Sequence, residues 1–299
     1  MIRRVGLFVR GSYPLPLSAV FATAWALGVT GLFAALTPGA PAWRPDAGTA
    51  VAAVSVTLDL LLMRVADDLR DAAYDRLHHP DRALASGAVH ARDLVVLFAA
   101  GSAVLLALNA GNGPAVLILT GQLLYTVGLV AAELRFGWPP GDAVVLSVLL
   151  SSPVQVLLNG YLYAVFLRSA GVPAHGPALL AGLAVVLLAA FHHEVARKVL
   201  RSPGAGARTY VQVFGLRATT VIAVAFAVAS AATGLAALRP WAGGPSAWGW
   251  LVVLPLLLVA GAARRFVHGG APRWPLRAVL AYLLTTFACY AVIGLGVTA

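Results

Sequence analysis

Charge is what this sequence has least of. Only 11% of the 299 residues are charged, 60% are hydrophobic, and the mean hydropathy is +0.86. A soluble globular domain carries about twice that share of charged residues, roughly 25%. The composition therefore excludes an ordinary soluble domain and indicates a chain that is mostly embedded in a bilayer.

Cysteine is almost absent as well. The single cysteine, Cys289, lies in the last apolar stretch of the chain. One cysteine cannot form an internal disulfide, and it leaves no cysteine pair for a structural zinc site. We interpret it as a small buried hydrophobic residue.

What the chain has in abundance is apolar stretches long enough to cross a bilayer. A helix needs about 20 predominantly apolar residues to do so. Nine stretches meet this requirement, at about 15–36, 48–66, 93–110, 113–132, 141–160, 174–194, 217–238, 247–263 and 277–297. We therefore predict an all-α integral membrane protein of nine transmembrane helices, arranged as a single domain over 1–299 around a central cavity.

The basic residues fix a predicted orientation. If the N-terminus is cytoplasmic, all but three of the 21 basic residues fall in cytoplasmic segments, and only Arg44, Arg168 and Arg239 lie outside. This is the bias of the positive-inside rule, and an even number of spans would destroy it. We predict a multi-pass protein of the cell membrane, with the N-terminus and the active-site loops cytoplasmic and the C-terminus outside. The net charge of +10 is then a topology signal, and nucleic-acid binding is not indicated.

Two large polar segments are expected on this cytoplasmic side. One follows the second span, and the other, at about 191–217, follows the sixth. The spacing suggests two parallel repeats of four helices plus one additional helix.

The first polar segment concentrates acidic side chains. Five of the 11 acidic residues lie between 64 and 87; they are Asp67, Asp68, Asp71, Asp75 and Asp81. In a continuous helix the i, i+4, i+8 spacing of Asp67, Asp71 and Asp75 would place them on one face. Clustered carboxylates favour a divalent cation, and Mg²⁺ typically combines one or two carboxylates with substrate phosphate oxygens. The segment predicts a diphosphate site bridged by Mg²⁺.

The spacing Asp67-Asp68-x-x-Asp71-x-x-x-Asp75, followed by Pro80-Asp81-Arg82 and Ser86-Gly87, resembles the first motif of the UbiA superfamily of intramembrane prenyltransferases. The nine-span layout and the basic turn at Arg135 are similar to that family too. The resemblance implies that Asp67, Asp68, Asp71 and Asp75 bind Mg²⁺. It also implies that the diphosphate contacts basic residues, namely Arg76, Arg82 and Arg135.

The second acidic motif of that family is altered here. At the corresponding place the chain reads His192-His193-Glu194-Val195-Ala196-Arg197-Lys198, so Glu194 is the only carboxylate. We expect Glu194 to serve as a metal ligand, and Arg197 and Lys198 to bind diphosphate in place of one Mg²⁺, because both side chains bind phosphate. The loop from Gly204 to Tyr210 resembles the loop that follows this motif in the family.

Three functions remain open from the sequence. The resemblance implies Mg²⁺-dependent transfer of a prenyl group from a prenyl diphosphate to an aromatic or other lipophilic acceptor. The catalytic residues would be Asp68, Asp71, Asp75, Glu194 and Lys198. A terpene cyclase of the same fold is the first alternative, and a non-enzymatic transporter or binding protein is the second.

Other polar residues have structural interpretations beside functional ones. Arg76 and Arg82 are equally explained as anchors at the membrane surface. A zinc site at His192 and His193 is disfavoured, because adjacent residues of a helix point in different directions. A further set lines the cavity or bonds between helices; it consists of Tyr125, Gln155, Asn159 and Tyr161.

Overall fold

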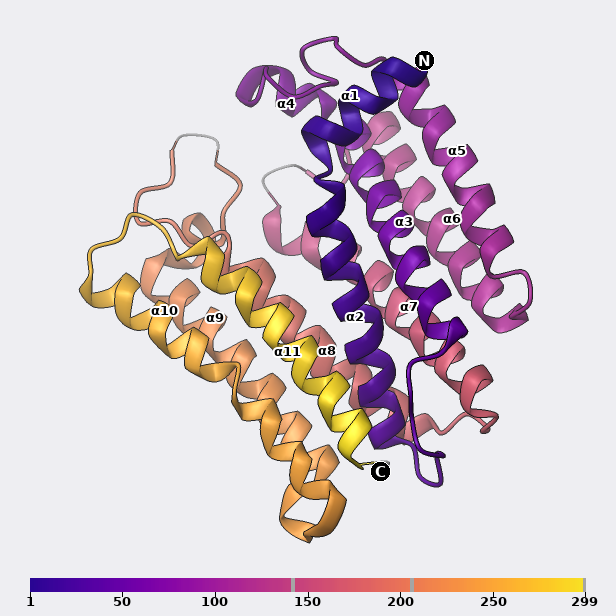
Figure 1. The fold of residues 1–299 in the computed structure, drawn as a ribbon. Helices are drawn as coiled ribbons and strands as arrows, with labels where there is room; N and C mark the ends of the chain where they lie inside the picture. Colours follow the sequence, from indigo (N-terminus) through magenta and orange to yellow (C-terminus); the bar gives the residue numbers. More distant parts are fainter. Residues whose placement is uncertain (141–142, 205–206, 298–299) are drawn as a thin grey trace.

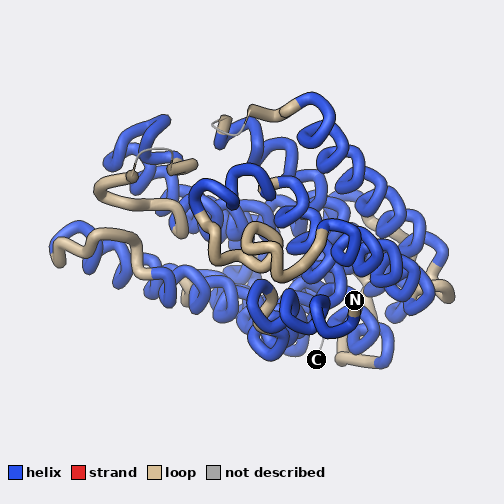
Figure 2. Tube along the Cα trace, turned by 90° about the horizontal axis from the view of Figure 1, so that it is seen from above, coloured by secondary structure: helices blue, strands red, loops and turns tan. Residues whose placement is uncertain are grey.

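The computed structural model describes residues 1–140, 143–204 and 207–297. The described part consists of helices and loops, with no strand, although Leu200 and Arg273 form an isolated bridge (Figures 1 and 2). The elements follow in the order α1 Ile2–Ser12, α2 Leu15–Leu36, α3 Ala47–Arg70, α4 Ala72–His78, α5 Ala91–Leu108, α6 Gly113–Phe136, α7 Val144–Ala170, α8 Gly176–Ala196, α9 Tyr210–Leu238, η1 Pro240–Ala242, η2 Gly244–Val253, α10 Leu256–His268 and α11 Leu276–Val297.

The nine predicted spans are confirmed. Within the described residues, nine helical segments are long and apolar enough to cross a membrane. The fifth differs most from its prediction: α7 extends to Ala170 rather than 160, and the predicted start at 141 lies outside the described residues. The grouping into two four-helix repeats and a ninth helix stays a prediction.

Local sequence signals explain where several helices start and stop. Asp46 begins α3 with a capping box, accepting a hydrogen bond of 2.8 Å from the backbone amide of Thr49. α6 and α7 end at Gly137 and Gly171, whose φ angles of 61° and 65° belong to the left-handed region. Glycine enters that region without a steric penalty, so both helices stop there.

The short helix α1 lies against the same end of the bundle as α4 (Figure 1). Its Phe8 is buried with Val65 and Leu94, and Nε of Arg4 lies 2.6 Å from Asp93 at the start of α5. The hydrogen bond to Asp93 raises the pKa of the Arg4 guanidinium. This pairing fixes α1 on the ends of α3 and α5.

Glycines allow α2 and α11 to pack closely along the middle of the bundle. A Cβ atom added to Gly294 would lie 2.5 Å from the Cα of Gly31, and one added to Gly28 would lie 2.5 Å from the carbonyl oxygen of Phe287. Small residues commonly permit such close approach between membrane helices. The contact places the aromatic residues of α2 and α11 next to one another.

Substitution of Gly294 by Ala should therefore destabilise the bundle. Its Cβ would meet backbone rather than a flexible side chain, so the helices must separate at a cost of about 1–3 kcal/mol. Gly121→Ala in α6 is the matched control, because nothing lies within 4 Å of its added Cβ. Thermal unfolding in detergent should show a lower midpoint for Gly294→Ala and an unchanged or higher midpoint for Gly121→Ala. Equal midpoints would contradict close packing at Gly31.

The two polar loops lie on the same side of the bundle. Nη1 of Arg208, between α8 and α9, lies 3.5 Å from Oδ1 of Asp71, between α3 and α4. The N-terminus lies at this end of the molecule, and the chain finishes at the opposite end (Figure 1). A chain that crosses the membrane an odd number of times has its two ends on opposite sides, and the positions of the two ends agree with this.

The charge bias predicts which side of the membrane this end faces. Reporters inserted after Ser86 and after Arg201 should both report a cytoplasmic location, whereas a reporter fused after Ala299 should be active only outside the cytoplasm. Paired phosphatase and fluorescent-protein fusions measure this. A difference between the two loop reporters would contradict both the fold and the shared site.

Candidate functional site

A central cavity of about 440 Å³ lies between α2, α3, α6, α7, α8 and α11. One end is charged, with side chains from the ends of α3 and α8; they are Asp67, Arg70, Glu194, Arg197 and Lys198. A smaller outer hollow of about 140 Å³ shares Arg70 and Lys198 with the cavity and adds Asp71, Glu133 and Arg208. The structure thus brings the two polar segments of the sequence to one site.

The acidic segment is not one continuous helix, so that part of the prediction is wrong. α3 ends at Arg70, Asp71 has φ −86° and ψ 6°, and α4 starts at Ala72. Asp67 and Asp68 both lie in the unbroken part of α3 but point in different directions, as neighbours on a helix do. The carboxylates therefore separate into two groups. Asp67 lines the cavity and Asp71 the outer hollow, whereas Asp68 and Asp75 line neither.

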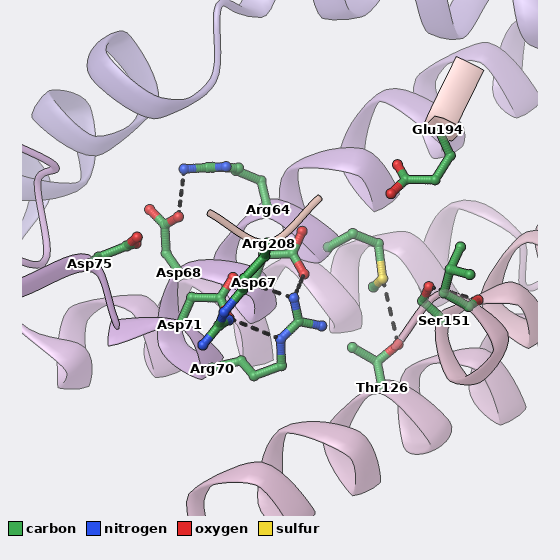
Figure 3. A network of polar contacts seen from close by, with 12 residues as sticks. Arg64, Asp67, Asp68, Arg70, Asp71, Asp75, Thr126, Ser151, Glu194 and Arg208 are labelled. Atoms are coloured by element: carbon green, nitrogen blue, oxygen red, sulfur yellow. Dashed lines mark hydrogen bonds and ion pairs between the residues drawn. The ribbon is translucent and has the colours of Figure 1, made fainter. Parts of the chain in front are cut away.

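The carboxylates at the cavity are paired with arginines. Nη2 of Arg70 lies 3.1 Å from Asp67, one helical turn earlier, and Nε lies 3.4 Å from Asp71 (Figure 3). Arg208 reaches Asp71 from the second loop, and its guanidinium lies 4.0 Å from the centre of the Tyr74 ring. Asp71 therefore connects both halves of the site.

Asp68 and Asp75 form the second group, beside two other arginines. Asp68 lies 2.6 Å from Nη2 of Arg64, and Asp75 accepts a hydrogen bond of 2.6 Å from Arg82. Burial works to lower the pKa of Arg82, but the hydrogen bond and the charges of Asp75 and Asp68 outweigh it and raise the pKa. The guanidinium of Arg82 consequently stays charged beside the acidic segment.

Two buried oxygens of this group have neither a hydrogen-bond donor nor an ion pair among the described residues. They are Oδ2 of Asp68 and Oδ1 of Asp75. The two carboxylates are close enough for Asp75 to influence Asp68 electrostatically. Two hard anionic groups with free oxygens suit one Mg²⁺. The side of α3 that carries Asp68 and Asp75 thus fits the predicted metal.

The α8 half of the site does not offer such oxygens. Glu194 accepts hydrogen bonds from Arg197 at 2.6 Å and from Tyr210 at 3.2 Å, and Nζ of Lys198 lies 2.7 Å from its Oε1. Figure 3 shows its carboxylate directed toward the side where Asp67 and Arg70 lie. Two cations against one carboxylate give this half a net positive charge, which favours an anion rather than a second metal.

Within the described residues, no three His, Cys, Asp or Glu side chains lie close enough together to hold a metal ion. The predicted ligand set of Asp67, Asp68, Asp71, Asp75 and Glu194 is therefore not assembled around one point. Any Mg²⁺ would use two protein carboxylates at most, with phosphate oxygens as its other ligands.

The remainder of the cavity is mostly apolar, and aromatic rings of α2 and α11 form one of its walls. Trp25 and Phe287 stack with ring centres 5.9 Å apart, and Phe21 packs edge-on against Trp25 at 5.8 Å. The indole nitrogen of Trp25 donates a hydrogen bond of 3.0 Å to Asn159. This bond fixes the ring on the cavity wall, although Asn159 itself is buried between the helices.

The other polar residues singled out in the sequence have separate positions. Gln155 lines the cavity. Tyr125 donates a hydrogen bond to the carbonyl of Leu150, and Tyr161 donates one to Asn109. The two tyrosines therefore form hydrogen bonds between helices. The sequence had left open whether they do this or line the cavity.

The histidine pair does not converge on a metal. Nδ1 of His192 donates a hydrogen bond of 2.7 Å to the carbonyl of Ala223 in α9, whereas His193 lines the central cavity. The two rings point in different directions, as expected for neighbours on a helix.

Three predicted diphosphate ligands line neither the cavity nor the outer hollow. Arg76 on α4 and Arg135 at the end of α6 are exposed, and Arg82 pairs with Asp75 instead. Sequence reasoning missed Arg70 and Arg208 as site residues. The available signals were the spacing of Arg70 three residues after Asp67 and the position of Arg208 in the loop that resembles the family.

Comparisons with known proteins support the same fold. No family model matches the sequence, and no curated protein matches it. Among solved structures, the chain is similar to the apo structure of a UbiA homologue from Aeropyrum pernix K1. The TM-score is 0.63 at 20% sequence identity, and the match covers 92% of this chain and 96% of that one. The chain therefore has the all-helical, multi-pass fold of that UbiA homologue.

Proposed function

We propose that this protein is an intramembrane prenyltransferase of the UbiA superfamily. It would transfer a prenyl group from a prenyl diphosphate to an aromatic or other lipophilic acceptor. The observation that carries the proposal is the central cavity itself, which joins an aromatic, apolar body to a charged end built by α3 and α8. Such a cavity matches a molecule with a hydrocarbon chain and a diphosphate.

The cations at the charged end would bind the diphosphate. Arg70, Arg197 and Lys198 line the cavity, and Arg208 lines the outer hollow. Negative charge builds up on the leaving diphosphate as the bond to the prenyl carbon breaks, so fixed cations lower the barrier to that step. All four are held by carboxylates here, and the diphosphate would compete for them.

Mg²⁺ is the expected cofactor on the α3 side. Oδ2 of Asp68 and Oδ1 of Asp75 are the free buried oxygens that would hold it, and Asp71, which lies between these two residues in the chain, lines the outer hollow. Bound there, the ion would add positive charge to the segment that carries Asp71. On the α8 side, Arg197 and Lys198 supply positive charge from the protein.

The apolar body would protect the reacting prenyl group from water. Phe21, Trp25 and Phe287 form a continuous aromatic wall. Aromatic faces stabilise a nearby cation, and exclusion of water prevents its premature capture. The same wall would surround the isoprenoid chain.

Product analysis distinguishes the three functions left open by the sequence. The purified protein in lipid vesicles would be incubated with prenyl diphosphates of several lengths, with and without a lipid extract, and the products identified by mass spectrometry. A prenylated acceptor that requires the extract supports the transferase. A hydrocarbon formed without acceptor indicates a cyclase, and no diphosphate release from any donor indicates a non-enzymatic protein.

Replacement of Asp71 by Ala should greatly reduce activity. The change removes the carboxylate that joins Arg70 and Arg208 at the outer hollow, and we expect Mg²⁺-dependent diphosphate release to fall by about 100-fold. Asp81→Ala, at an exposed carboxylate in the loop after α4, is the matched control. Monodispersity in detergent would verify folding. Full Mg²⁺-dependent activity of Asp71→Ala would contradict the assigned site.

Lys198 should bind the diphosphate directly. Lys198→Ala should raise KM for the prenyl diphosphate by roughly tenfold and lower kcat, since a charge-assisted contact is lost. Lys198→Asp should give a steeper dependence on Mg²⁺, because a carboxylate would create a second metal ligand there.

Chemical labelling tests Lys198 without relying on turnover. It is the single lysine of the chain, so an amine-reactive reagent has one side-chain target. Prenyl diphosphate with Mg²⁺ should protect it, whereas a prenyl alcohol should not. Unchanged kinetics of Lys198→Ala at limiting Mg²⁺, together with equal labelling in all conditions, would show that Lys198 is only a surface anchor.

A further inference from the structure

Asp59 is an acidic side chain buried in the middle of a membrane span. It lies near the midpoint of α3 and is fully buried. Neither of its carboxylate oxygens has a hydrogen-bond donor or an ion pair among the described residues. It lines neither the central cavity nor the outer hollow. Acidic residues inside membrane helices are rare and costly, so this one indicates a function that the proposed reaction does not account for.

Asp59 belongs to a buried polar cluster between four helices. α3 packs against α5, α6 and α7 (Figure 1). The cluster takes members from α3, α6 and α7 and from the residue that follows α5; they are Ser55, Asp59, Asn109, Gln122 and Tyr161. All five are buried, and Tyr161 is close enough to Asp59 to be influenced by its charge.

One part of the cluster is well paired. The amide nitrogen of Asn109 donates a hydrogen bond of 2.8 Å to Ser55, and the amide oxygen of Asn109 accepts one of 3.0 Å from Tyr161. These bonds connect α3, α5 and α7. They leave Asp59 and Gln122 as the members whose oxygens need a partner.

The oxygens of Asp59 and Gln122 lack donors. Gln122 approaches the carboxyl group of Asp59 from α6, but its nitrogen donates to the sulfur of Met63 at 3.5 Å. Its oxygen Oε1 has no donor within the described part of the chain, and the same holds for both oxygens of Asp59. Three buried acceptor oxygens therefore belong to two neighbouring side chains.

A single proton cannot satisfy these three oxygens. A protonated Asp59 would donate to Oε1 of Gln122, but its second oxygen would still lack a donor, and a buried acceptor without a donor is costly. A metal cation takes all three oxygens as ligands and also neutralises the carboxylate. The set of acceptors consequently favours a metal ion.

The charge of the cluster selects the valence of that ion. The cluster contains one carboxylate, and its other members are neutral. A divalent ion would leave an uncompensated positive charge in the apolar interior, whereas a monovalent ion makes the cluster neutral. The cluster is enclosed by close-packed helices, which leaves little room. Of the common monovalent ions, the smaller Na⁺ therefore fits better than K⁺.

From these observations we propose that Asp59 and Gln122 form a binding site for one Na⁺ ion within the membrane. Ser55, one helical turn before Asp59 on the same face of α3, would offer its hydroxyl oxygen as a further ligand. Met63 and Thr126, one turn after Asp59 and Gln122, line the central cavity. The ion would thus hold α3 against α6 behind the cavity wall. The inference does not depend on the proposed function, because no step of prenyl transfer involves Asp59.

Thermal unfolding in detergent measures the binding of the ion. Divalent cations would be removed with EDTA, and NaCl would be compared with equal concentrations of KCl and of choline chloride. Na⁺ should raise the unfolding midpoint by a few degrees and in a saturable manner, because a ligand that binds only the folded state stabilises it. K⁺ should act less strongly, and choline should not act.

Asp59→Asn should abolish the Na⁺-dependent shift. The change removes the charge and keeps the size, so the midpoint in choline chloride should equal or exceed that of the parent. Asp81→Asn, at an exposed carboxylate, is the matched control and should keep the full shift. If Asp59→Asn does not fold, Gln122→Met removes one ligand oxygen at similar size. It should raise the Na⁺ concentration for half of the shift by about tenfold, as expected for a lost contact with a charged group.

Infrared spectroscopy distinguishes Na⁺ from a proton at Asp59. In saturating NaCl, the difference spectrum between the parent and Asp59→Asn should contain the bands of a carboxylate. The carbonyl band of a protonated carboxyl group in that spectrum would overturn the proposal. Equal midpoints of the parent in NaCl and choline chloride, a full Na⁺ shift in Asp59→Asn, or an unchanged Na⁺ dependence in Gln122→Met would also overturn it.

Discussion

The site depends on ion pairing at the ends of two membrane helices. Carboxylates at the edge of a bilayer are costly unless a cation accompanies them. α3 meets this need with Arg64 and Arg70, and α8 with Arg197 and Lys198. Each helix therefore brings acidic and basic groups together to the end of the cavity. Arg208 then connects the halves by its contact with Asp71.

The two halves of the site are chemically unequal. In the α3 half each carboxylate has an arginine partner, but one buried oxygen of Asp68 and one of Asp75 lack a donor among the described residues. The α8 half has two cations around Glu194. One half thus suits a metal ion and the other an anion. A diphosphate with Mg²⁺ satisfies both requirements at once.

The apolar packing of the helices explains why the charged side chains lie at one end of the central cavity. Close packing of α2 on α11 at Gly31 and Gly294 sets Trp25 against Phe287, and these rings form the inner wall of the cavity. Such walls cannot solvate ions, so the polar groups collect at one end.

The sequence by itself determined the class of protein and the chemistry of its charged segments. Nine apolar stretches predict nine spans because a bilayer imposes a minimum length on each helix, and the positions of the aspartates and of Lys198 mark the two segments that meet. The sequence could not show that the chain breaks at Asp71, since aspartate is compatible both with a helix end and with an unbroken helix. It therefore predicted one face for Asp67, Asp71 and Asp75.

Only the tertiary structure decided which charges share a space, because contacts between residues far apart in the chain depend on how whole helices pack. The contact of Arg208 with Asp71 and the separation of Arg76 and Arg135 from the cavity are of this kind. An apolar hollow of about 230 Å³ between α7, α8 and α9 is another example, since its walls come from three helices and no local pattern marks it.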